Sequence, residues 1–309
     1  MATDEHGRLI SLKPNLVTRA KIIQHARNFF VRQRFLEVDT PIRMPEIAPE
    51  VNIVPITSGD WFLSTSPELF MKRLLATGYK NLFQISHCFR QGERGRRHNP
   101  EFTMIEWYRT GADYMKLVGD TEQLITSLAK TLQHSLKISY QGQTIDLSPP
   151  WPKVTVRKAY RQYAGWDPVA DPDPLRFDTD MVAKVIPNFT RNQPTIILDY
   201  PAPMASLARL KPRNRRVAER AEVFIGGLEI ANAYSELIDV AEQTERFTEE
   251  IEQIKKEQHR EIKLPLKFLE AIQDLPECGG IALGIDRLVM LFCDAASIDE
   301  VMPFTVDTV

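Results

Sequence analysis

Apolar residues at helical spacing mark the first part of the chain. They predict a helix over residues 14–36, with Pro14 and Asn15 at its start and residues 1–13 as an N-terminal tail. The apolar stripe comprises Ile22, Ile23, Ala26, Phe29 and Phe30. An extended segment, 35–41, follows, and Pro41 should end it, because proline cannot donate to a sheet ladder.

The next stretch predicts a hairpin with a long polar loop. A short strand at 61–64 leads to a helix that opens at Ser66-Pro67, with Ser66 as N-cap. Two apolar strands, 81–89 and 102–108, then flank the polar loop 90–100. An amphipathic helix is expected over 113–135.

The second half alternates between irregular and extended segments. Residues 141–194 are rich in proline and weakly periodic, so we expect an irregular insertion with one helix near 156–163. Strands are predicted at 195–200, 221–225 and 228–237, a charged helix at 244–260, and a glycine-rich strand from 279 that leads into an apolar helix, 288–293. Hairpin-linked strands with segregated helices favour an α+β fold with an antiparallel sheet, in one domain over 1–309.

Composition narrows the class of protein. The net charge is −2 and the charged fraction 26%, so no global basic field draws the chain to nucleic acid. The three cysteines show no metal-type spacing, which suits a reducing compartment. The N-terminus lacks an apolar signal core, and no apolar run approaches the ~18 residues that a membrane span needs. We therefore expect a cytoplasmic protein without membrane contact.

An arginine at the end of the first hairpin strand is the first candidate for chemistry. Arg90 would direct a planar cation at one point, which suits a phosphate that gains charge during displacement, and Phe102 offers a flat face for a base. A solvated basic loop is the plainer interpretation. A further possibility is RNA contact by Arg94, Arg96 and Arg97.

A second arginine and several glutamates add to this pattern. Arg287 follows a glycine-rich strand end, where other groups can approach the backbone closely, although it could simply pair with Asp286. Glu222, Glu229 and Glu236 recur seven residues apart. Carboxylates can hold Mg²⁺ against nucleotide phosphates, and the last two stand in apolar surroundings where an unpaired acid is costly.

Three segments in order resemble the signature motifs of class II aminoacyl-tRNA synthetases. The helix, strand and Pro41 resemble motif 1, FRQGERGRRHNPEF at 89–102 resembles motif 2, and GGIALGIDR at 279–287 resembles motif 3. Within that class, TSPELFMKRL, RHNPEFTMIEWY and LEIANAYSEL are similar to lysyl-tRNA synthetases. The resemblance runs from about residue 14 to residue 305.

The length of the chain distinguishes between members of this class. Only about 15 residues precede motif 1, so we expect no OB-fold anticodon domain. Such a core, together with DYPAPMASLA at 199–208, resembles the elongation factor P–(R)-β-lysine ligases, also called lysyl-tRNA synthetase-related proteins. The resemblance implies an ATP-dependent ligase that uses Mg²⁺, activates lysine or (R)-β-lysine as an adenylate, modifies elongation factor P and forms a homodimer through motif 1. It argues against tRNA as a partner.

The resemblance also implies roles for individual residues. ATP would contact Arg90, Gln91, Gly92, Glu93, Asn99, Phe102, Glu229, Ile230, Gly284 and Arg287. The amino acid would contact Ser66, Pro67, Glu68, Tyr108, Glu236 and Ala282, and Mg²⁺ would bind Glu222 and Glu229. Arg90 and Arg287, as the catalytic pair, would contact the α- and γ-phosphates, and Glu236 the side-chain ammonium. Glu68 alone could equally complement the helix dipole.

Two positions depart from lysyl-tRNA synthetases. These usually have glycine where Ala282 stands, so the extra methyl would reshape the substrate pocket. They also place a glutamate two residues after the motif 2 arginine, where this chain has Gly92 followed by Glu93. Two other functions stay open: a minimal lysine–tRNA ligase that uses the basic loop alone, and a non-catalytic paralogue.

Overall fold

The first helix is longer than the apolar stripe predicts. The computed structural model of the protein describes residues 5–309, and α1 spans Glu5–Arg32 with Pro14 in its interior. The predicted tail at 1–13 and the start at Pro14 are therefore wrong for residues 5–13, while residues 1–4 lie outside the described part. Tertiary contacts explain the difference: Leu12 is buried, and Arg8 donates a 2.8 Å hydrogen bond to the Pro303 carbonyl. These contacts offset the hydrogen bond that Pro14 removes.

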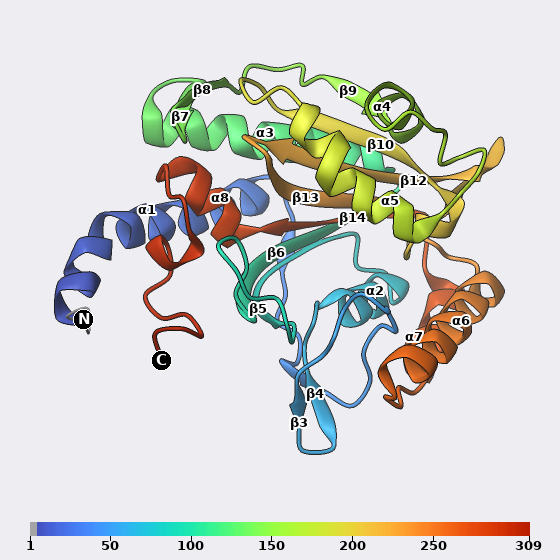
Figure 1. The fold of residues 1–309 in the computed structure, drawn as a ribbon. Helices are drawn as coiled ribbons and strands as arrows, with labels where there is room; N and C mark the ends of the chain where they lie inside the picture. Colours follow the sequence, from blue (N-terminus) through green and yellow to red (C-terminus); the bar gives the residue numbers. More distant parts are fainter. Residues whose placement is uncertain (1–4) are drawn as a thin grey trace.

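A nine-stranded sheet forms the centre of the molecule (Figure 1). The strands run in the order β1 (Leu36–Glu37), β5 (Asn81–Phe89), β6 (Glu101–Thr110), β14 (Cys278–Gly284), β13 (Leu228–Ser235), β12 (Asn214–Ile225), β10 (Thr195–Pro201) and β9 (Lys153–Thr155), and β11 (Leu210–Lys211) pairs with β12. All neighbours are antiparallel except β1 with β5 and β10 with β9. The predicted α+β class with an antiparallel sheet is confirmed.

The two faces of the sheet have different covers. Side chains alternate along each strand, and the odd-numbered ones of the central strands pack into the main core with α1, α3 (Tyr114–Gln133) and α8 (Ile285–Phe292). Part of the opposite face is covered by α4 (Val156–Tyr163) and α5 (Pro174–Asp180) through Tyr160, Phe177 and Phe224. Figure 1 shows α3 behind the sheet and α5 in front of it. The part of this second face that α4 and α5 leave uncovered carries the candidate site.

A second group of elements closes one side of this face. Helices α2 (Glu68–Ala76), α6 (Val240–Gln258) and α7 (Leu266–Ala271) share a small core that includes Leu75, Phe247 and Phe268. Next to them is a three-stranded sheet of β2 (Arg43–Met44), β4 (Trp61–Leu63) and β3 (Thr57–Ser58). Helix α2 begins one residue later than Ser66 predicts, with Pro67 at the N-cap, although Ser66 Oγ still accepts a 3.0 Å bond from the Glu68 amide.

The segment predicted as irregular, 141–194, is more regular than expected. It contains the second strand of the hairpin β7 (Lys137–Tyr140)–β8 (Gln143–Asp146), then β9, the correctly predicted α4, α5, a π-helical turn Met181–Val185 and a 3-10 turn Ile186–Asn188. Local caps start the helices, since Thr155 accepts from the Lys158 amide and Asp173 from the Arg176 amide. Each element is too short for a periodic signal, and its stability comes from packing on the sheet.

None of the helices within residues 5–309 is long and apolar enough to cross a membrane.

Candidate active site

A cavity of about 1340 Å³ opens on the second face of the sheet. Residues from four strands form the floor of this cavity. The strand register aligns them, because directly opposed residues point to the same side of a sheet. Glu222 lies opposite Asn232, Asn232 opposite Ala282, and Ala282 opposite Glu106. A parallel row beside it contains Arg220, Tyr234, Gly280 and Tyr108. All eight line the cavity, so residues up to 176 positions apart in sequence form one continuous surface.

A bulge in β13 directs Glu229 to this surface. Ala231 and Ala233 pack in the main core, and an unbroken strand would send Glu229 to the same side. The register shifts by one residue there, so that Val223 pairs with Ala231 but Phe224 with Glu229. Glu229 therefore lies on the face of Glu222 and lines the cavity.

Arginines gather at one end of the cavity, which we call the basic end. Arg287 donates to the Glu229 carbonyl at 2.9 Å and to its carboxylate at 3.3 Å, and contacts His98 Nε2 at 2.5 Å. Burial and the neighbouring Arg287 lower the pKa of His98, so this imidazole is neutral near pH 7. Arg287 is thus held by a carbonyl, a carboxylate and an imidazole, and a phosphate could replace the two side-chain partners.

Arg90 belongs to the same end. It donates to the Thr65 carbonyl at 3.3 Å, pairs with Glu93 at 3.3 Å, and lies 5.1 Å from the centre of the Phe102 ring. Glu93 also faces His98, since its charge acts on the His98 pKa. The loop between β5 and β6 therefore supplies a partner to each arginine: Glu93 pairs with Arg90, and His98 contacts Arg287.

The C-terminal segment braces this loop. The Val306 amide donates to Asn99 Oδ1 at 2.9 Å, the Ile298 amide donates to the Arg96 carbonyl at 2.8 Å, and Arg94 pairs with Asp307. The Asn99 amide group also donates to the Glu101 carbonyl at 2.6 Å. Asn99 lines the cavity, but its side chain holds the loop in place.

Carboxylates gather at the other end, which we call the acidic end. Lys72 of α2 forms ion pairs with Glu68 and Glu236, and its side chain is 1% exposed. Burial by itself lowers the pKa of Lys72, but the two carboxylates more than offset this and raise it. Burial raises the pKa of Glu236, and Lys72 counters that effect. In this cluster the Lys72 ammonium is the fixed cation, and Glu68 and Glu236 share it.

Glu236 lines the acidic end of the cavity. Within residues 5–309, Glu236 Oε1 has no hydrogen-bond partner, although it is buried. It lies directly above Gly280, where an added Cβ would come within 2.2 Å of Oε1 and 2.3 Å of the Tyr108 ring. Glycine is required there by close approach. A buried carboxylate oxygen without a partner is a site for a cation, because leaving it unpaired is costly.

Glu106 completes the acidic end. Its carboxylate accepts from Ser66 Oγ at 2.6 Å and from Tyr108 Oη at 3.3 Å. Burial, followed by repulsion from Glu68, raises the pKa of Glu106 to about 8. The two hydroxyl groups hold this carboxyl beside the floor position of Ala282.

Most of the predicted site residues line this one cavity. They are Ser66, Glu68, Arg90, Glu93, Asn99, Phe102, Tyr108, Glu222, Glu229, Ile230, Glu236, Ala282, Gly284 and Arg287. Pro67 is buried at the N-cap of α2, and Gln91 and Gly92 lie on an exposed turn where Gly92 has a φ of +85°. Glu93, the residue after that turn, is the one that reaches the cavity.

The lining or supporting residues that were not predicted from sequence include four charged ones: Glu50, Lys72, Glu106 and Arg220. Two of them carry a readable signal. Lys72 stands in the apolar face of a helix between Leu69 and Leu75, and Glu106 interrupts an apolar strand. A charge at a core position indicates a partner or a function. Glu50 lies in a segment without helix or strand, and Arg220 follows Glu219 in a charged part of its strand, so neither contrasts with an apolar face.

The pair Glu222 and Glu229 fits a divalent cation. Glu222 pairs with Arg220 at 2.7 Å, and the Glu229 charge contributes to raising its pKa after burial itself. Within residues 5–309 no cluster of three or more acidic, histidine or cysteine side chains could hold a metal. Two carboxylates are what Mg²⁺ commonly takes from a protein when nucleotide phosphates and water supply the other ligands.

Family comparison places the chain in a known class. Residues 8–308 match the model of the class II tRNA synthetases for D, K and N. The chain belongs to this class II synthetase family, as its three motifs, its sheet and its two-ended cavity indicate.

Two kinds of relatives share this core. An elongation factor P–(R)-β-lysine ligase of Klebsiella pneumoniae (strain 342) is 35% identical over 95% of this chain and 95% of its own length. Lysine–tRNA ligases of Pelotomaculum thermopropionicum and Psychrobacter sp. (strain PRwf-1) are 35% and 37% identical over 93% and 95% of this chain. This chain spans only 62% and 63% of those two ligases.

Proposed function

We propose that the protein is an ATP-dependent ligase that activates (R)-β-lysine, or lysine, as its adenylate and transfers it to a lysine ε-amine of elongation factor P. One observation carries the proposal: a single cavity has arginines at one end and a buried, partnerless carboxylate oxygen at the other. A triphosphate fits the first end and an ammonium group the second.

At the basic end, two arginines act on the nucleotide. Arg90 stabilises charge on the α-phosphate, Arg287 holds the γ-phosphate, and Phe102 stacks on the adenine, with Glu93 at its edge. Glu222 and Glu229 hold Mg²⁺, which neutralises phosphate charge when bound. Catalysis rests on positioning and electrostatics, because the carboxylate of the amino acid is itself the nucleophile.

At the acidic end, the carboxylates select the amino acid. Glu236 Oε1 accepts a hydrogen bond from the side-chain ammonium, while Glu68 and Tyr108 position the backbone amine. Ala282 sets the depth between these groups and thereby the choice between lysine and its β-isomer. The substrate carboxylate then points towards Arg90, attacks the α-phosphate and displaces pyrophosphate.

A minimal lysine–tRNA ligase is the second candidate. The exposed Arg94, Arg96 and Arg97 of the loop between β5 and β6 and the similarity to lysine–tRNA ligases favour it. The match over 95% of the length of an elongation factor P ligase favours the first candidate.

A paired assay tests both functions. Purified protein is incubated with ATP, Mg²⁺ and lysine or (R)-β-lysine, and ATP–pyrophosphate exchange is measured. Exchange that depends on the amino acid and is abolished by EDTA supports adenylation, and exchange without that dependence rejects it. Mass spectrometry of elongation factor P and a tRNA charging assay then identify the acceptor.

Two further properties belong to the proposal. We propose a homodimer through α1 and β1, since Ile10, Val17, Val31 and Leu36 expose large apolar side chains there. Light scattering that gives a monomer mass would reject this. We also propose that the protein acts in the cytoplasm, where its proposed acceptor is found.

A further inference from the structure

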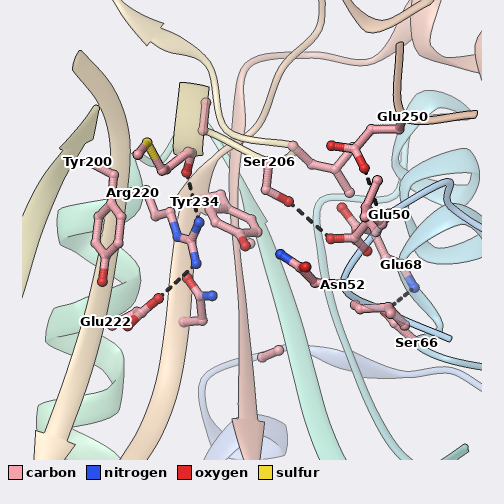
Figure 2. A pocket seen from close by; sticks show the side chains of 18 of the residues that line it. Glu50, Asn52, Ser66, Glu68, Tyr200, Ser206, Arg220, Glu222, Tyr234 and Glu250 are labelled. Atoms are coloured by element: carbon pink, nitrogen blue, oxygen red, sulfur yellow. Dashed lines mark hydrogen bonds and ion pairs between the residues drawn. The ribbon is translucent and has the colours of Figure 1, made fainter. Parts of the chain in front are cut away.

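A glutamate outside the motifs faces the middle of the cavity. Glu50 lies on the loop between β2 and β3 and lines the cavity from the side of α6. Its carboxylate accepts a 3.2 Å hydrogen bond from Ser206 Oγ of the opposite loop. Figure 2 shows Glu50 between Ser206, Glu68 and Glu250, with its carboxylate directed into the open space.

The position of Glu50 links the two ends of the cavity. The charges that act on it come from Glu68 of the acidic end, Arg90 of the basic end and Glu250 of α6. Tyr234 on the floor faces it as well. An acyl adenylate joins the amino acid to the α-phosphate, so its acyl carbon must lie between the contacts of Glu68 and Arg90. Glu50, whose surroundings include both Glu68 and Arg90, is a further carboxylate near the expected position of the acyl carbon.

We propose that Glu50 receives the acceptor amine and removes its proton in the transfer step, an inference that rests on the proposed function. The acceptor ammonium gives one proton to the Glu50 carboxylate, and the free amine attacks the acyl carbon. A C–N bond forms, the bond between the acyl carbon and the phosphate oxygen breaks, and AMP leaves. The second proton of the nitrogen leaves with the AMP phosphate. The acceptor class is therefore a cationic primary amine.

The protonation behaviour of Glu50 suits this task. Burial, followed by repulsion from Glu68, raises its pKa to about 7, against the opposing effects of Arg90 and Ser206. A base works best when its pKa is near the working pH. A lysine ε-ammonium is inert until it loses a proton, since its ordinary pKa is ~10.4. A ribose hydroxyl would bring no positive charge to this carboxylate.

The test separates transfer from adenylation. Glu50→Gln is compared with wild type in ATP–pyrophosphate exchange, in single-turnover transfer to elongation factor P, and in trapping of the adenylate by hydroxylamine, whose weakly basic nitrogen needs no base. We expect unchanged exchange and trapping, and a loss of transfer of roughly 10²-fold or more. Glu250→Gln is the matched control, because glutamine can still accept the 2.7 Å bond from the Val51 amide.

Each outcome decides the inference. Transfer that is unaffected in Glu50→Gln, or exchange that falls as far as transfer, overturns it. Ser206→Ala provides a second test that does not depend on the folding of the first variant. Loss of the hydroxyl raises the Glu50 pKa, so the pH inflection of transfer must move upward from near 7 while exchange stays constant. An inflection that does not move overturns the inference. Wild-type exchange without amino-acid dependence would instead reject the proposed function.

Discussion

The two ends of the cavity are built in opposite ways. At the basic end, the acids that hold the arginines are partly exposed: Glu229 is 41% and Glu93 33% exposed in their side chains. At the acidic end, Lys72 and Glu236 are each 1% exposed. Arginines whose carboxylate partners are partly exposed can exchange those partners for phosphates. A buried ion pair, in contrast, fixes the position of the carboxylate before any ligand arrives. The basic end can therefore adapt to a ligand, and the acidic end is preorganised.

The largest expected effect is the loss of an arginine at the adaptable end. Arg287→Ala should lower the rate of ATP–pyrophosphate exchange roughly 10²–10³-fold, because a cation aimed at developing phosphate charge is removed. Thermal unfolding should change little, since Arg287 makes only replaceable contacts. Arg96→Ala, on the exposed loop, is the control. A rate within a factor of three of wild type would contradict the role of Arg287.

Removal of the fixed cation should instead act on stability. Lys72→Met leaves the buried Glu236 and the partly buried Glu68 unpaired and should cost about 3–5 kcal/mol in the free energy of unfolding. Without Lys72 the pKa of Glu236 rises further above its unfolded value of ~4.3, so the folded variant binds the extra proton. Its stability is therefore greatest at low pH and falls as the pH rises through this range.

Urea unfolding of Lys72→Met at pH 5 and pH 8 measures this effect, with the exposed Lys158→Met as control. Equal stability of wild type and Lys72→Met at pH 8 would show that the ion pair does not organise the acidic end.

The next effect tests which end of the cavity binds the amino acid. Glu236→Gln should raise the KM for the amino acid about 10–100-fold, since a hydrogen bond to a charged group contributes ~1.5–3 kcal/mol. The KM for ATP should not change. Glu277→Gln, with a side chain 71% exposed, is the control. An equal rise in both KM values would mean that the two ends are not independent.

The smallest effect sharpens the acidic end. Ala282→Gly removes one methyl from the cavity floor and should change the ratio of kcat/KM for (R)-β-lysine over lysine by about tenfold, in favour of lysine. Competition between the two isomers in the exchange assay measures this ratio. A ratio unchanged from wild type would separate Ala282 from substrate choice.

The sequence predicts most of the central strands and misses most of the short elements, and the strand predicted at 221–225 is only the end of β12. Strand Asn81–Phe89 and helix Val156–Tyr163 have the predicted bounds, since an apolar run marks the strand and the Thr155 cap starts the helix. Residues 5–13 and α5 were missed, since they are stabilised by distant partners such as Pro303 and the sheet. Local pattern carries no information on such contacts.

The candidate site shows the same division. The spacing of seven from Glu222 to Glu236 selects three glutamates that all line the cavity, yet alternation alone would place Glu229 and Glu236 on opposite faces. The bulge in β13 decides the face, and it has no signal that we could read from single residues. Lys72 and Glu106 could have been found by the rule applied to Glu229, since each interrupts an apolar stretch. Glu50 could not, because only the folded chain brings it to the cavity.

The brace between the last residues and the loop after β5 has a practical consequence. A purification tag fused behind Val309 would disturb the Val306 amide and the Asp307 carboxylate that hold Asn99 and Arg94, and proteolytic removal of the residues after Met302 would abolish both contacts. A nucleotide affinity measured on such a preparation would then depend on the altered C-terminal segment as well as on the cavity. Preparations for kinetic work should carry the tag elsewhere or have it removed.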